Sequence, residues 1–170
     1  MNRLALLAAS VALLGAAPAP KTTPIATADP AEWRAAPAPG VALAISGAKS
    51  APGALRLDFD FRGKAGWAAA TRKVDLVLPA RWEIRLRLRG EALPNDLELK
   101  LSDPSGENVW WFRKRDATLP RDFEPLRVKQ RQVEFAWGPA GGGAPSRIGS
   151  VEVTVTAGRG GRGWLEVADL

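Results

Sequence analysis

Apolar residues recur at every second position in segment after segment from Val41 to the C-terminus. In the segment 81–89, Trp82, Ile84, Leu86 and Leu88 alternate with charged residues. Because successive side chains of an extended strand point to opposite faces, this period predicts strands with one face in a core and one in water. Further segments suited to strands are 41–45, 55–61, 74–78, 96–102, 107–113, 133–137, 151–155 and 163–170.

Turn signals separate these segments, and no helical period with caps extends over ten or more residues. Asp103-Pro104-Ser105-Gly106 has the residue types of a type I turn and predicts a hairpin between strands 96–102 and 107–113. About nine or ten short strands with such turns indicate an all-β fold, an antiparallel β-sandwich. An eight-stranded closed barrel is the structural alternative.

The composition restricts the kinds of metal site and catalytic mechanism that are possible, since the chain has no Cys, no His and no Tyr. Disulfides, thiolate or imidazole metal sites, a cysteine nucleophile and a Ser-His-Asp triad are therefore excluded. Acid–base catalysis could use only Asp, Glu, Lys or Arg. Glu83 and Glu98 are conceivable members of a carboxylate pair, but nothing separates them from ion-paired surface acids. We therefore expect no catalytic residue.

The N-terminus resembles an export signal. A short basic start, an apolar run from Leu4 to Leu14 and small residues after it predict a signal peptide at 1–20. A Pro/Ala-rich linker at 21–30 and a β-sandwich domain at 31–170 follow, with Trp33 expected to tuck against the domain. This predicts a periplasmic or secreted protein without a membrane anchor in the mature chain.

Three further segments carry a family resemblance. They are Leu97 to Trp111 with its Asn-Val-Trp-Trp run, Lys129 to Pro139 with Phe-Ala-Trp-Gly-Pro, and Gly160 to Gly163 leading to Asp169-Leu170. Together they resemble the N-terminal jelly-roll domain of secreted bacterial discoidin-like (coagulation-factor type C) proteins and, more broadly, galactose-binding-like carbohydrate-binding modules. The resemblance covers residues 30–170, with Ala168 where an Asp is common. It implies a jelly roll that binds glycans.

The resemblance also implies a structural calcium ion. The acid of the last strand, Asp169, would hold it together with oxygens from the N-terminal segment, for which Glu32 is a candidate.

Trp110 and Trp111 are adjacent on one expected strand, so their side chains point to opposite faces. Parity with Val109 places Trp111 in the core and Trp110 outside, beside Asn108. An exposed indole can stack on the apolar face of a sugar ring, with Asn108 bonding its hydroxyls. The alternative is that both indoles pack under loops.

Arginines form a comb along the segment 81–89. Arg85 and Arg87 face one way, and Lys100 of strand 96–102 is expected beside them. Such a surface could grip an anionic glycan through bidentate contacts, or be a solvated face with cross-strand ion pairs. Nucleic acid is not expected, because no recognised reading motif is present.

Trp137 precedes the glycine-rich loop 138–143, which either lines a ligand mouth or connects a long hairpin. The sequence thus predicts an exported, non-catalytic polysaccharide-binding module, with a downstream catalytic domain as a conceivable partner. A protein–protein interaction module on the same fold is the alternative. The predicted ligand-binding residues are Trp110, Asn108, Arg85, Arg87, Lys100 and Trp137.

Overall fold

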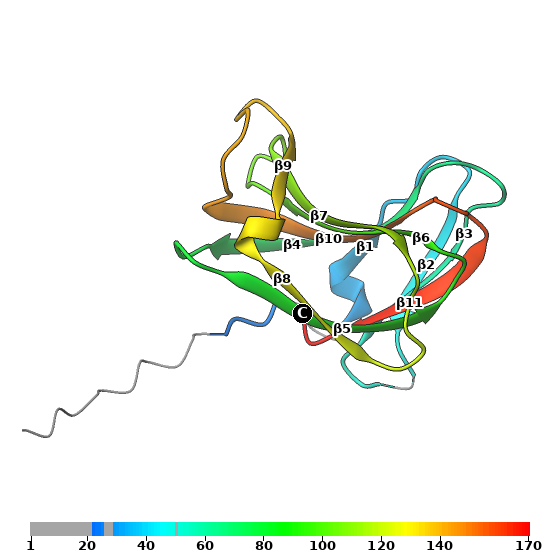
Figure 1. The fold of residues 1–170 in the computed structure, drawn as a ribbon. Coiled ribbons are helices and arrows are strands. Elements are labelled where there is room, and N and C mark those ends of the chain that lie inside the picture. Colours follow the sequence, from blue (N-terminus) through cyan, green and yellow to red (C-terminus); the bar gives the residue numbers. More distant parts are fainter. Residues whose placement is uncertain (1–21, 26–28, 50) are drawn as a thin grey trace, which may run out of the picture.

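Two antiparallel sheets face each other in a jelly-roll β-sandwich (Figure 1). The computed structural model describes residues 22–25, 29–49 and 51–170. The predicted signal peptide therefore lies outside the described residues. Within them, no helix is both long and apolar enough to cross a membrane. The helices described are two short 3-10 turns, Pro30–Glu32 and Gln130–Gln132.

The larger sheet has six strands. In spatial order they are β1 (Trp33–Ala35), β4 (Trp67–Val77), β10 (Arg147–Thr156), β6 (Asn95–Ser102), β7 (Val109–Ala117) and β9 (Glu134–Trp137). The smaller sheet has five strands, in the order β2 (Ala42–Gly47), β3 (Leu55–Asp60), β11 (Arg162–Ala168), β5 (Glu83–Glu91) and β8 (Glu124–Lys129). At one edge of the larger sheet, β9 and the loop that follows it stand up from the layer (Figure 1).

The apolar residues of the alternating segments form the core between the sheets, as the period predicts. Leu57 of β3, Leu99 of β6, Val153 of β10 and Leu165 of β11 are all buried there. Their neighbours in sequence point outward. The sandwich is therefore the correct alternative, and the closed barrel is wrong.

Two stretches of strand lack the alternation. β4 begins at Trp67, ahead of the expected 74–78, and runs through Ala68, Ala69 and Ala70, which are all buried. Alanine on both faces gives no apolar period, because a small side chain is covered by its neighbours on either side. β1 falls just after the expected linker, and its Trp33 is buried in the core as predicted.

The connection Ala92–Pro94 corrects one expected pairing. Strand β6 does not lie beside β5, because the chain passes here from the smaller sheet to the larger one. Lys100 is therefore on a different sheet from the arginine comb. The expectation failed because consecutive strands joined by short connections usually pair, and a jelly roll breaks that tendency at its crossings between sheets.

The predicted turn at 103–106 is confirmed. The Gly106 N–H lies 3.0 Å from the Asp103 carbonyl oxygen and 2.9 Å from its Oδ1. Hydrogen bonds from the Asn108 and Ser105 side chains and from the backbone lower the pKa of Asp103 to about 2. The turn fixes the register of β6 against β7, in which Ser102 pairs with Val109.

Candidate functional site

The outer face of the larger sheet carries a continuous row of outward side chains. In the strand register, Thr71 pairs with Glu152, Glu152 with Lys100, and Lys100 with Trp111. Paired residues on neighbouring strands lie on the same side of a sheet. We call this surface the network face and define it by Trp67, Thr71, Asp96, Glu98, Lys100, Trp111, Arg113, Trp137, Glu152 and Thr154.

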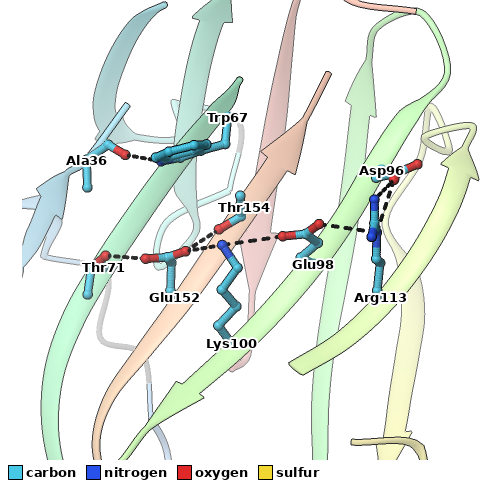
Figure 2. A network of polar contacts seen from close by, with 9 residues as sticks. All are labelled: Ala36, Trp67, Thr71, Asp96, Glu98, Lys100, Arg113, Glu152 and Thr154. Atoms are coloured by element: carbon cyan, nitrogen blue, oxygen red, sulfur yellow. Dashed lines mark hydrogen bonds and ion pairs between the residues drawn. The ribbon is translucent and has the colours of Figure 1, made fainter. Parts of the chain in front are cut away.

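Ion pairs join the strands across the middle of the network face (Figure 2). The Lys100 Nζ lies 2.8 Å from Glu152 Oε1 and 3.3 Å from Glu98 Oε2. Glu152 also accepts hydrogen bonds from the hydroxyls of Thr71, at 3.0 Å, and Thr154, at 2.6 Å. These contacts hold polar atoms of three strands in fixed positions.

The network continues to β7 through Arg113. Its guanidinium pairs with Asp96 and lies 3.3 Å from Glu98 Oε1 (Figure 2). Burial alone would raise the pKa of Asp96, but the Asp116 N–H and Arg113 outweigh burial and hold this pKa below its ordinary value of 3.8. Glu98 and Thr154 are only 3% and 0% exposed although they face outward, so long side chains cover them.

Indoles flank these ion-paired residues, which we call the polar floor of the network face. The Trp137 side chain is 48% exposed, and Trp67 on the opposite side is 45% exposed. Trp111 meets Trp137 edge to face, with ring centroids 5.9 Å apart, and the Arg113 guanidinium carbon lies 5.4 Å from the Trp111 ring centroid. The Trp67 indole N–H donates to the Ala36 carbonyl oxygen at 3.0 Å (Figure 2), which fixes the ring.

The two exposed indoles lie at opposite corners of the face. Trp67 shares a row with Asp96 at one end of β6, and Trp137 shares a row with Ser102 at the other end. Strand spacing and rise then separate their Cα atoms by roughly 25 Å. A single sugar ring cannot touch both indoles, whereas an oligosaccharide could.

The expected exposure of Trp110 is wrong. Trp110 is only 6% exposed, packs edge to face on Phe135 and donates its indole N–H to the Gly143 carbonyl oxygen at 2.7 Å. Val109 lies in the outward row with Ser102 and Trp137. Counting alternate positions from the expected core position of Val109 therefore put Trp110 and Trp111 on the wrong sides. Of the adjacent pair, Trp111 is the one on the outer face.

Asn108 and Trp110 instead hold the loop that follows Trp137. The Asn108 amide donates to Asp103 Oδ2 at 2.7 Å, and its oxygen accepts from the Ala140 N–H at 2.7 Å. A Cβ at Gly138 would lie 2.5 Å from the Glu107 carbonyl oxygen, so the loop passes directly over this turn. These two residues position the strand end that presents Trp137.

Arg85 and Arg87 lie on the outer face of the smaller sheet, away from Lys100 and Trp137. Arg85 pairs with Glu83 at 2.6 Å, Arg127 binds the same carboxylate, and Arg87 pairs with Asp169. The Arg127 and Arg85 hydrogen bonds lower the pKa of Glu83. These contacts match the solvated ion-pair interpretation of the comb.

Glu83 and Glu98, the two acids considered for catalysis, project from the outer faces of different sheets. Each is paired with arginine or lysine. This arrangement does not bring them together in one cleft.

The candidate calcium residues are each engaged by an arginine. Glu32 pairs with Arg72, and Asp169 pairs with Arg87. A guanidinium competes with a metal ion for the same carboxylate oxygens. Across the described part of the chain, no three Asp or Glu side chains gather as metal ligands would. The donor set seen here thus falls short of the six to eight oxygens that calcium takes.

Sequence reasoning missed Trp67, Trp111 and Glu152 as members of the network face. The alternation in 151–155 showed that Glu152 points outward. It did not show which residues of other strands lie beside it. Trp67 stands before an alanine run with no strand signal. Trp111 was assigned to the wrong side of its strand.

No family model and no curated protein matches the sequence. Solved structures match the fold. Two structures of a family 11 carbohydrate-binding module from Clostridium thermocellum, one from the cellulase Lic26A-Cel5E and one in complex with a β-1,3-1,4-mixed-linked tetrasaccharide, align with TM-scores of 0.58 and 0.59. Both are 12% identical, and the alignments cover 82% and 81% of this chain and 88% of each module.

A family 29 carbohydrate-binding module aligns with a TM-score of 0.50 at 9% identity, covering 86% of each chain. The agarase AgWH50C aligns with a TM-score of 0.54 at 8% identity, over 88% of this chain but 25% of the agarase. At these identities the likeness concerns the jelly-roll fold.

Proposed function

We propose that this protein binds a polysaccharide without cleaving it, through the network face. Trp137 and Trp67 supply apolar platforms for sugar rings, and the polar floor between them bonds to hydroxyl groups. The observation that carries the proposal is the pair of half-exposed, positioned indoles on either side of a fixed polar network. The shared fold with carbohydrate-binding modules supports it by analogy.

The chemistry of the face suits a neutral sugar chain. The indole faces cover the C–H faces of sugar rings, and the edges of the rings turn their hydroxyls toward the floor. Carboxylates such as Glu152 accept from hydroxyls, while Lys100 and Arg113 donate to them. Because these charges already pair with each other, the floor offers directed hydrogen bonds without strong attraction for an anion.

Isothermal titration with mixed-linkage glucan, xylan and galactan oligosaccharides tests the proposal. Trp137→Ala is expected to weaken binding at least about tenfold, which corresponds to about 1.4 kcal/mol. Trp67→Ala is expected to act on long oligosaccharides and not on short ones, because of the separation of the two indoles. Leu93→Ala removes an exposed apolar side chain of the β5–β6 connection and is the matched control.

Unchanged affinity in a folded Trp137→Ala variant would contradict the network face as the binding surface. If a broad glycan array stays silent while the protein captures a defined partner through Trp137, the protein-interaction function replaces this one.

The finer identification as a galactose-binding-like, discoidin-related module rests on the sequence resemblance. A preference for galactans over glucans in the same titrations would support it.

Export is part of the proposal, and calcium binding stays a prediction that the arginine pairs of Glu32 and Asp169 weigh against. Each has its own test. Cleavage after the predicted signal would give a mature N-terminus near residue 21, detectable by mass spectrometry of protein from the periplasm or medium. A calcium ion bound by Glu32 and Asp169 would raise the melting temperature in a chelator-reversible way, and an unchanged melting temperature would argue against it.

A further inference from the structure

A second surface, on the smaller sheet, is hollowed into a cleft of about 740 Å³. This volume falls in the range of small-ligand sites, about 300–1,000 Å³. We call it the arginine cleft. The residues that line it are Ser46, Gly47, Lys49, Arg56, Asp58, Arg89, Gly90, Glu91, Arg121, Trp164 and Glu166.

Three strands form the floor of the arginine cleft. β11 contributes Trp164 and Glu166, flanked in register by Arg56 and Asp58 of β3 and by Arg89 and Glu91 of β5. All of these residues alternate with core residues, so they must point outward.

Two connections, β2–β3 and β7–β8, supply further lining residues. A small apolar cluster of Ala48, Ala54 and Ala168, with Phe123 packed against it, ties the two connections together. The β7–β8 connection also packs directly on β5, because a Cβ at Gly90 would lie 2.6 Å from Leu119 Cδ1. Packing of both connections on the smaller sheet therefore preforms the cleft.

Buried charge fixes the floor. Glu166 is only 2% exposed and accepts from Arg56 Nη1 at 3.0 Å and from Arg89 Nε at 2.7 Å. Asp58 binds Arg56 as well, and its hydrogen bond is the main reason that the pKa of Arg56 is raised. The Arg56 guanidinium carbon lies 4.4 Å from the Trp164 ring centroid. Preorganised guanidinium groups and an indole thus share one surface.

Two cations lining the cleft have no such partner. Lys49 comes from the β2–β3 connection and Arg121 from the β7–β8 connection, and both are exposed. Neither side chain makes an ion pair or hydrogen bond with the described residues. Two unpaired cations on separate connections favour an anionic group between them.

The other lining groups indicate what kind of molecule bears that anionic group. Asp58 and Glu91 accept hydrogen bonds, Ser46 donates or accepts, and Trp164 offers apolar surface. Carboxylates repel a ligand with charge on every unit, such as nucleic acid. They suit a ligand that has hydroxyl donors beside its acidic group.

We propose that the arginine cleft binds an acidic sugar unit, one that carries a carboxylate or a sulfate, independently of the network face. The acid lies between Lys49 and Arg121, and the ring and its hydroxyls meet Trp164 and Asp58. A glycan with both neutral and acidic units could then engage both faces of the sandwich.

Titration of the full chain with galacturonic acid and with galactose 6-sulfate, each a single acidic unit with free hydroxyls, tests the proposal and distinguishes the two acids. The variant Lys49→Ala/Arg121→Ala is expected to lose at least about tenfold in affinity for one of them. The matched control, Lys64→Ala/Arg131→Ala, removes the same charge from exposed sites outside the cleft and is expected to change affinity less than twofold. Neither variant touches the core.

Equal losses in both double variants would mean attraction by the net charge of +6 alone and would overturn the proposal. Unchanged affinity in the cleft variant would overturn it too. The outcome is separable from the proposed function, because Trp137→Ala should leave acidic-sugar binding intact and the cleft variant should leave neutral-glycan binding intact.

Discussion

The two outer faces of the sandwich use charge in opposite ways. On the network face three carboxylates and two cations pair laterally in an open layer, and the exposed groups at its margins are indoles. On the smaller sheet a buried carboxylate gathers guanidiniums under two connections, and the exposed groups are cations. One pleated scaffold can thus present a neutral platform and a cationic cleft, because alternate residues are free of the core.

Removing the buried carboxylate of each face should show the largest difference. Glu166→Ala leaves two guanidiniums side by side with one carboxylate fewer, so we expect a loss of about 2 kcal/mol in unfolding free energy, discounted because both arginines reach water. Glu98→Ala should lose about 1 kcal/mol, since Lys100 keeps Glu152 and Arg113 keeps Asp96. Urea denaturation measures both, and equal losses would remove the distinction.

The affinities for acidic sugars and for neutral glycans should depend differently on salt. Raising ionic strength from about 20 mM to about 500 mM screens an exposed anion between Lys49 and Arg121, and we expect acidic-sugar affinity to fall about tenfold. Neutral-glycan affinity should change less than about twofold over the same range, because indole stacking carries no net charge. A parallel salt dependence of both ligands would indicate that they share a site.

Removing the hydrogen bonds that hold the loop after Trp137 should have a smaller effect, confined to neutral-glycan binding on the network face. Asn108→Ala removes the anchor of the loop after Trp137, so we expect neutral-glycan affinity to fall about threefold and Trp fluorescence to shift, with acidic-sugar affinity unchanged. Asn108→Asp keeps the acceptor for Ala140 but sets a second carboxylate beside Asp103. A loss in Asn108→Ala as large as that of Trp137→Ala would instead indicate direct contact of Asn108 with the sugar.

The smallest effects concern pH. The folded pKa of Asp96 is lowered, so its contribution to stability is present above the ordinary value of 3.8 and is lost as pH falls through the lowered value. With no histidine in the chain, we expect neutral-glycan binding and stability to be flat from about pH 5 to 8. Titration by calorimetry checks this, and a transition near neutral pH would contradict it.

The turn at 103–106 gives a test at a single residue. Nuclear magnetic resonance of Asp103 should find its pKa at about 2, and Asn108→Ala should raise it toward 3.8 because the largest stabilising hydrogen bond is lost. An unshifted value in that variant would show that Asn108 does not hold the carboxylate.

Much of the fold could be predicted from the alternation. Leu55 to Phe61, Ile84 to Leu88 and Leu97 to Leu101 reach the core as their period requires. Of the predicted ligand residues, Lys100 and Trp137 share the network face, whereas Arg85 and Arg87 lie on the other sheet. Trp110 and Asn108 support the loop after Trp137. The errors have one origin, because alternation assigns two sides to a strand without saying which is inward or which strand is next to it.

The sequence by itself determined that strands would form, that their charged residues would lie on the side away from the core and that the Asp103 turn would be tight. These properties depend on near neighbours in the chain. Only the tertiary structure decided that Thr71, Glu152, Lys100 and Trp111 form one row, and that Lys49 and Arg121 line one cleft. Such groupings depend on strand order and on crossings between sheets, since the pairing of distant strands is set by the packing of the whole sandwich.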